Sequence, residues 1–191
     1  MGGGYFSNAG VFLINAVFGL YIFAVLLRFL FQLVRADFYN PLCQAIVTVT
    51  NPTLRPLRRY IPAFRGIDSA SVVLLLALQL FNTLLVLMVV GVSPRPAGLL
   101  VITLAELMSK TVWAFLGAVI IQVILSWVGS GGYNPVASVV QALADPVSRP
   151  ARRLVPPLGG LDFSPMVVIV VLQLVLMLAV APLRDLGAAL L

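Results

Sequence analysis

The chain has 191 residues, of which 61% are hydrophobic and only 9% are charged. Water-soluble domains carry about 25% charged residues, so this composition excludes an ordinary soluble globule. Residues 1–27, 69–94, 111–144 and 163–183 contain no charged side chain. Since a helix needs ~20 apolar residues to cross ~30 Å of hydrocarbon, these runs predict four membrane-spanning helices at about 11–34, 70–92, 111–129 and 165–183. The predicted fold class is an all-α, polytopic membrane protein.

The residue types also limit the chemistry. The chain has no histidine and a single cysteine, Cys43. Zinc sites with histidine ligands, His-based catalytic triads and haem with an axial imidazole are therefore excluded. One thiol cannot form an internal disulfide bond. We expect no enzymatic activity, no cofactor and no metal site.

The formal net charge is +6, and most of the basic residues lie in two connectors, 35–68 and 129–164, that each join a pair of predicted helices. Short loops rich in Lys and Arg remain in the cytoplasm. We therefore expect a multi-pass membrane protein, with both connectors facing the cytoplasm and both termini on the opposite side of the membrane. Binding to nucleic acid is not expected, because the charge belongs to no soluble basic domain.

Within the first predicted helix, Arg28 lies about two turns before the inner end. Two interpretations are open for a charged residue at this depth. Its long side chain can reach the headgroup region by snorkelling. Alternatively, it has a partner within the helical bundle, for which Asp68 or the backbone of the connector would serve.

The first connector recurs in the second at a constant offset. The first copy reads Tyr39-Asn40-Pro41, Asn51-Pro52, Arg55-Pro56, Arg58-Arg59, Pro62, Gly66 and Asp68, and the second reads Tyr133-Asn134-Pro135, Asp145-Pro146, Arg149-Pro150, Arg152-Arg153, Pro156, Gly160 and Asp162. A repeat of many residues without any slip of the offset indicates an internal duplication.

Each connector has the residues of a helix start. Asn40 before Pro41 predicts a capped start, and Asn51-Pro52 predicts that the chain restarts a second, short helix there. After this restart, Arg55, Arg58 and Arg59 share one face, whereas Leu54, Leu57 and Ile61 share another. The pattern predicts a short amphipathic helix at the membrane interface, and the second copy predicts the same.

The arginines of these faces are candidates for binding anionic lipid headgroups or a partner protein, and they are Arg55, Arg58, Arg59, Arg149, Arg152 and Arg153. The alternative is that they only determine topology and pair with nearby carboxylates. The candidate acids, which also suit the N-termini of helices, are Asp68, Asp145 and Asp162.

The remaining predicted membrane helices carry amide side chains. Gln79 and Asn82 lie in the second helix, Gln122 in the third and Gln173 in the fourth. Gln173 is the repeat equivalent of Gln79, and Gln122 occupies the place of Arg28. Amides within hydrocarbon usually form hydrogen bonds between helices. The alternative interpretation is a polar path for a substrate.

The duplication predicts the domain organisation. Residues 1–93 form a first repeat, 94–110 a linker that extends the third helix or lies at the interface, and 111–191 a second repeat. Glu106 and Lys110 in the linker are spaced for a surface ion pair. Since each repeat crosses the membrane twice, the two helical hairpins are parallel and related by an axis along the membrane normal.

The duplicated pattern resembles the YggT family of bacterial and plastid membrane proteins. In each half, an apolar helix leads through Asn-Pro and Asn/Asp-Pro to Arg-x-x-Arg-Arg, and then through Pro, Gly and Asp to a second helix. Ser126-Trp127 resembles the helix end of the family. The first copy departs from the pattern at Ser69-Ala70-Ser71, and Gln122 stands where the resemblance implies an arginine.

The resemblance implies an integral inner-membrane protein connected with osmotic tolerance and ion homeostasis. Relatives in plastids and cyanobacteria are connected with assembly of a cytochrome complex and with organisation of nucleoids or division. Our first hypothesis is a non-enzymatic organising or osmotic-stress-tolerance factor, whose partners are membrane lipids, a second copy of the chain or other membrane proteins. The alternative is a component of a small ion or solute transporter.

Overall fold

The computed structural model describes residues 3–64, 66–128, 134–154 and 162–191. Its elements in chain order are α1 (Gly3–Leu33), α2 (Pro41–Tyr60), α3 (Ser69–Val90), α4 (Pro96–Val128), α5 (Pro135–Leu154), α6 (Ser164–Val175), the π-helical turn η1 (Leu176–Val180) and α7 (Ala181–Ala189). Within the described residues there is no strand, only an isolated antiparallel bridge between Phe64 and Ile67. The predicted all-α class is confirmed.

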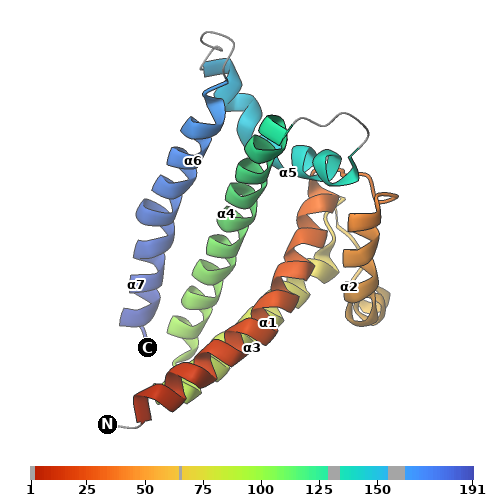
Figure 1. Ribbon diagram of the computed structural model, residues 1–191. Helices are drawn as coiled ribbons and strands as arrows, with labels where there is room; N and C mark the ends of the chain where they lie inside the picture. The colour runs from red at the N-terminus through yellow and green to blue at the C-terminus, as the bar shows by residue number, and fades with distance from the viewer. Residues whose placement is uncertain (1–2, 65, 129–133, 155–161) are drawn as a thin grey trace.

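Among the described residues, four helical stretches are long and apolar enough to cross a membrane: α1, α3, α4, and the continuous run from α6 to α7. In Figure 1, α1 and α4 run in one direction and α3 and α6 return in the other, so both termini lie at the same end. Between 17% and 28% of the most hydrophobic window of each stretch is buried within the protein. The remainder faces outward, as lipid-exposed helices require, and the chain is a polytopic membrane protein of two parallel hairpins.

Local residues set several of the helix ends. The Asn40 side chain accepts a hydrogen bond from the Leu42 N–H at 3.0 Å, which confirms the predicted cap of α2. Gly66 has a φ of 82° before the start of α3, and Gly91 ends that helix with a φ of 79°. Both values lie in the left-handed region that glycine adopts readily. Pro156 and Gly160 of the second copy fall outside the described residues.

The predicted restart of the connectors at Asn51-Pro52 and Asp145-Pro146 is wrong. α2 and α5 are each one helix of 20 residues with two prolines in its interior, Pro52 and Pro56 in α2 and Pro146 and Pro150 in α5. A proline inside a helix removes one backbone hydrogen bond. The side of α2 that carries Leu54 packs into the core, and this packing compensates for the lost hydrogen bond.

Of the two alternatives for the linker at 94–110, the structure shows the extension of the third membrane helix. α4 is one helix of 33 residues that begins at Pro96. The charge of Glu106 does not interrupt it, because this carboxylate is paired with Lys110 at 3.4 Å and with Arg184 at 2.9 Å. The first pair confirms the predicted spacing, and the second connects α4 to α7.

The fourth membrane stretch contains a π-helical turn, η1, which ends two residues before Pro182. Pro182 has no N–H to donate to a carbonyl one turn earlier, and a π-bulge is a common response to such a gap. At this end of the bundle, Gly98 of α4 crosses close to Gly187 of α7. A Cβ added to Gly98 would lie 2.8 Å from the Gly187 carbonyl oxygen.

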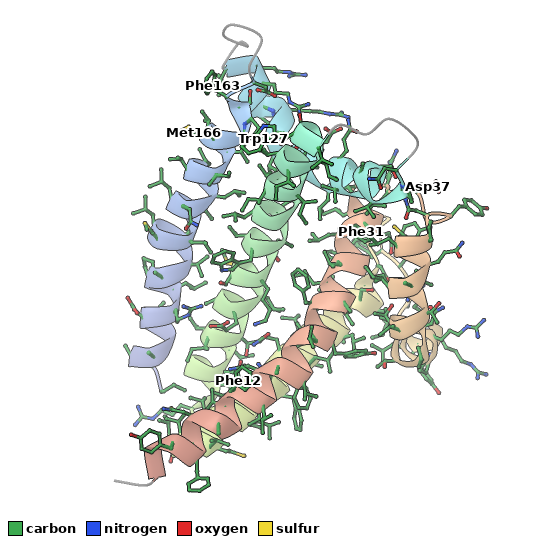
Figure 2. The ribbon with its side chains drawn as sticks, in the orientation of Figure 1. Phe12, Phe31, Asp37, Trp127, Phe163 and Met166 are labelled. Carbon is green, nitrogen blue, oxygen red and sulfur yellow. The ribbon has the colours of Figure 1, made fainter. Side chains whose placement is uncertain are left out.

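The two connectors lie together at the end of the bundle opposite the termini (Figure 1). The Asn40 amide donates to the Pro135 carbonyl at 2.6 Å and to the Ser138 hydroxyl at 3.1 Å, which ties α2 to the start of α5. In Figure 2, Trp127 lies at the same end, whereas Phe12 lies toward the termini. The side chain of Trp127 is 82% exposed. An exposed tryptophan at a helix end is typical of the membrane–water interface.

This arrangement predicts the accessibility of matched cysteine probes. In a Cys43→Ser background, Tyr60→Cys and Leu154→Cys place thiols at the ends of α2 and α5, where the native side chains are 81% and 79% exposed. Both should react with a membrane-impermeant maleimide from one side of the membrane. Ser93→Cys, between the hairpins, should react only from the other side, and labelling of the first two from opposite sides would refute the parallel repeat.

Candidate functional site

Arg28 of α1 is buried, with 5% of its surface exposed. Its Nη1 donates to three acceptors on α2, which are the Val47 carbonyl at 3.3 Å, the Thr50 hydroxyl at 2.7 Å and the Asn51 side-chain oxygen at 2.9 Å. The second interpretation, a partner within the bundle, is therefore the one that the contacts support. The connector backbone supplies one of the acceptors, whereas Asp68 forms no hydrogen bond with Arg28.

Asp68 pairs with Arg58 instead. This carboxylate lies at the start of α3, 4% exposed, and also accepts a hydrogen bond from the Ser71 hydroxyl at 2.5 Å. Burial alone would raise the pKa of Asp68, but the hydrogen bonds from Arg58 and Ser71, together with the charge of Arg58, lower the pKa below its ordinary value of 3.8. Asp68 is therefore ionised at neutral pH.

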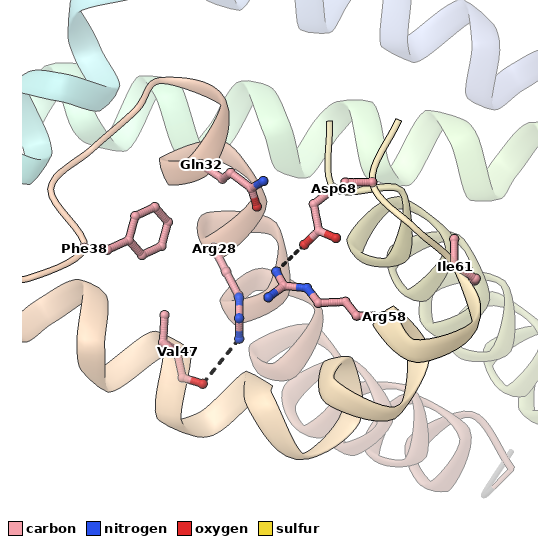
Figure 3. A pocket seen from close by; sticks show the side chains of 8 residues that line it. Arg28, Gln32, Phe38, Val47, Arg58, Ile61 and Asp68 are labelled. Atoms are coloured by element: carbon pink, nitrogen blue, oxygen red, sulfur yellow. Dashed lines mark hydrogen bonds and ion pairs between the residues drawn. The ribbon is translucent and has the colours of Figure 1, made fainter. Parts of the chain in front are cut away.

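These side chains line a pocket of about 490 Å³ between the end of α1, α2 and the start of α3. Its lining residues are Arg28, Gln32, Phe38, Val47, Arg58, Ile61, Ala63 and Asp68. Figure 3 shows the guanidinium groups of Arg28 and Arg58 side by side in this pocket. Two guanidinium groups and one carboxylate line it, so the lining side chains carry a net positive charge. We call it the first-repeat pocket.

The second repeat has an equivalent, smaller pocket of about 250 Å³. Four of its lining residues, Gln122, Ser126, Arg152 and Asp162, are the repeat equivalents of Arg28, Gln32, Arg58 and Asp68. Arg152 Nε pairs with Asp162 at 3.3 Å, as Arg58 pairs with Asp68. Gln122 brings no charge, so the charges of this second-repeat pocket cancel.

The two carboxylates differ in exposure. The Asp162 side chain is 45% exposed and that of Asp68 only 5%. The hydrogen bond from Ser164, followed by the charge of Arg152, lowers the pKa of Asp162 below its ordinary value. Because water screens exposed pairs, the Arg152–Asp162 pair stabilises the fold less than the Arg58–Asp68 pair does.

The other candidate arginines divide into two groups. Arg149 pairs with Asp145 one turn earlier at 2.7 Å. Arg55, Arg59 and Arg153 are exposed and form no ion pair with any described residue. Pairing with carboxylates therefore accounts for three of the six candidate arginines, Arg58, Arg149 and Arg152. The other three are available to bind anionic headgroups or a partner protein.

A second polar region lies between α1, α3 and α4, where a pocket of about 170 Å³ is lined by Asn15, Gln79, Asn82, Thr83 and Glu106 among others. Asn82 donates to Asn15 at 3.2 Å, which confirms one bridge between helices, but Gln79 bonds to Thr83 of its own helix. The side-chain oxygens of Gln79 and Asn82 are buried and have no partner among the described residues. Gln173 is half-buried.

Sequence reasoning missed three residues that line the first-repeat pocket, Gln32, Phe38 and Val47. It also missed Thr50 and Ser71, which bond to Arg28 and Asp68. The two copies differ at both Arg28/Gln122 and Asn51/Asp145, and Arg28 contacts Asn51. Because the copies also differ at most of the neighbouring positions, the sequence did not single out this pair. Within the described ranges, no three Cys, Asp or Glu side chains gather where they could share a metal ion.

Comparison with known proteins places this architecture in a family. The family model described as CCB3/YggT matches the chain twice, at residues 7–89 and 101–183. An uncharacterized protein of Pseudomonas aeruginosa is 46% identical over 176 residues, covering 91% of this chain and 89% of that protein. The uncharacterized protein YggT of Escherichia coli K12 is 41% identical over 170 residues, covering 88% and 87%. No solved structure matches the chain.

The two carboxylates predict unequal effects of substitution. Asp68→Asn removes the anion from a buried hydrogen-bonded group and should lower the free energy of unfolding by about 1–3 kcal/mol. Asp162→Asn, at the matched exposed position, should lower it by less than about 1 kcal/mol. Denaturant titration of both variants in detergent at neutral pH measures the difference.

The pH dependence of the free energy of unfolding serves as a control for the Asp68→Asn variant. Since the folded-state pKa of Asp68 is lowered, its contribution is fully present above 3.8 and is lost as the pH falls through the folded-state value. The wild type and Asp68→Asn should therefore converge in stability below pH 3.8. Equal losses for the two substitutions at neutral pH would contradict the assignment.

Proposed function

Because this chain belongs to the CCB3/YggT family, with one matched segment in each half, we propose that it is a non-enzymatic membrane-organising protein. The arginine faces of α2 and α5 hold anionic lipid headgroups and thereby position the protein and its membrane partners. The observation that carries this proposal is the exposure of Arg55, Arg59 and Arg153 without an ion pair among the described residues. They lie on connectors that share one end of the bundle with Trp127 (Figures 1 and 2).

The faces of α2 suit a membrane interface. Leu54 is fully buried and Leu57 and Ile61 pack against the core, whereas Arg55 and Arg59 point away from it. A helix with such faces lies at the level of the headgroups, where each arginine gains about 1 kcal/mol from an anionic leaflet. The proposal places this end in the cytoplasm of the bacterial inner membrane and both termini in the periplasm, by the rule that basic loops remain inside.

Osmotic-stress tolerance is the physiological setting that we propose for this activity. Its support is the family resemblance, and the arginine faces supply a mechanism, because binding of anionic lipids depends on ionic strength. Raised salt weakens contacts of exposed arginines and leaves the buried ones nearly unchanged. The exposed faces therefore respond to an osmotic upshift while the Arg58–Asp68 pair remains intact.

The direct test is the selection of lipids around the protein. Quenching of tryptophan fluorescence by brominated phosphatidylglycerol, relative to brominated phosphatidylcholine, should show a preference for the anionic lipid that disappears in the triple variant Arg55→Gln, Arg59→Gln, Arg153→Gln. Arg95→Gln, a loss of charge at the opposite end, should retain the preference. An unchanged preference in the triple variant would remove the proposal.

A second candidate function is conduction of a small solute or ion. It is favoured by the pocket of about 170 Å³ between α1, α3 and α4, where the buried Gln79 and Asn82 oxygens lack partners among the described residues. Conduction of a cation is disfavoured, because Glu106, which lines the pocket, is already paired with both Lys110 and Arg184. Polar groups without a partner are costly in the membrane and often mark a transport path.

Flux assays separate the two functions. In vesicles containing the purified protein, the organising function predicts no flux of K⁺, Na⁺ or glycerol above that of empty vesicles. A flux in the wild type that falls in Asn82→Leu and survives in Leu80→Ala, a change on the same helix, would replace the organising function with conduction.

A further inference from the structure

We propose that the first-repeat pocket binds one phosphate group, carried by a lipid headgroup or free in solution. The inference rests on the proposed function, because it names the ligand and the place at which one anionic group is held tightly. The second-repeat pocket holds none. The arrangement of Arg28 and Arg58, the charge of the pocket, and the comparison of the two copies each support it.

Arg28 is a buried cation with only neutral partners. Its three acceptors are a carbonyl, a hydroxyl and an amide oxygen, and none carries a charge. A buried charge without a counter-charge is costly, and most so inside a membrane protein. The one carboxylate that lines the pocket, Asp68, acts on Arg28 through its charge, but it is paired with Arg58. Two guanidinium groups therefore share one carboxylate, and an anion in the pocket supplies the second negative charge.

The donors needed for such an anion are present. All three hydrogen bonds of Arg28 start from Nη1, so Nε–H and Nη2–H have no acceptor among the described residues. Arg58 bonds to Asp68 through Nη2 alone. Figure 3 shows both guanidinium groups facing the same space. Two planar groups with free N–H donors match the oxygens of a phosphate, which guanidinium binds in bidentate fashion.

Size and position fit a headgroup. The pocket of about 490 Å³ is within the range of small-molecule sites. It lies between the end of α1 and the start of α3, where the membrane-spanning stretches Gly4–Leu33 and Ser69–Val90 meet the connector. Lipid phosphates lie at this level of a bilayer.

The second copy is an internal control. At the positions of Arg28 and Asn51 it has Gln122 and Asp145. Its pocket has no cation beyond Arg152, which is paired with Asp162. We therefore infer one phosphate site in each chain, and the duplicated halves differ in this property.

The sharpest variant is Asn51→Asp. The Asn51 side-chain oxygen lies 2.9 Å from Arg28 Nη1, and the second copy carries Asp145 at this position. The substitution gives Arg28 an internal carboxylate and cancels the charge of the pocket without removing any hydrogen-bond partner. Native mass spectrometry of protein released from mixed micelles should show one retained phosphatidylglycerol in the wild type and at least about tenfold less retention in Asn51→Asp.

The reciprocal variant guards against a folding defect. Gln122→Arg with Asp145→Asn gives the second repeat the arginine and asparagine of the first and should raise the number of retained phosphatidylglycerol molecules from one to two. Inorganic phosphate identifies the source of the ligand. The site binds free phosphate if phosphate raises the melting temperature of the delipidated wild type, if this effect is lost in Asn51→Asp, and if no lipid is retained. The site binds a headgroup if lipid is retained and phosphate has no such effect.

The proposal is overturned if neither probe binds, or if Asn51→Asp binds as the wild type does. That failure is distinct from failure of the organising function, because the triple variant of Arg55, Arg59 and Arg153 leaves the pocket residues unchanged. Loss of lipid preference in the triple variant, with unaltered retention in Asn51→Asp, would remove the pocket and keep the organising function.

Discussion

The burial of one guanidinium group, that of Arg28, constrains the first half of the molecule. A buried cation must have hydrogen-bond partners, because little water reaches it to replace them. Val47, Thr50 and Asn51 supply those partners, so α2 must fold back against α1 (Figure 1). This contact places the last turn of α2 beside the start of α3, where Arg58 meets Asp68. One buried charge thus leads to a pocket formed by three helices.

Comparison of the two repeats distinguishes the structural features that both halves share from those present in one half alone. Both have a connector helix with two internal prolines and an arginine that pairs with the carboxylate before the returning helix. These shared features hold each hairpin together. The unpaired charge of Arg28 is absent from the second half, where Gln122 stands instead. Two halves of one architecture therefore differ in the charge that each can offer to an anion.

Sequence reasoning predicted the membrane spans, the duplication, the parallel hairpins and the Asn40 cap, because these follow from local composition and spacing. It failed where tertiary contacts override local preference. Pro52 interrupts the hydrogen-bond ladder of α2, yet the helix continues because its buried side packs against the bundle. Glu106 would end an apolar run, yet Arg184, distant in the chain, compensates for it. The partners of Arg28 depend on how α2 folds back, which no local pattern specifies.

The most direct measurement is an experimental structure of the protein in nanodiscs that contain phosphatidylglycerol, in a buffer that contains inorganic phosphate, at a resolution that shows headgroups. The account predicts phosphate density within hydrogen-bond distance of Arg28 and Arg58, and none beside Gln122 and Arg152. An empty first-repeat pocket, or equal density in both pockets, would contradict it.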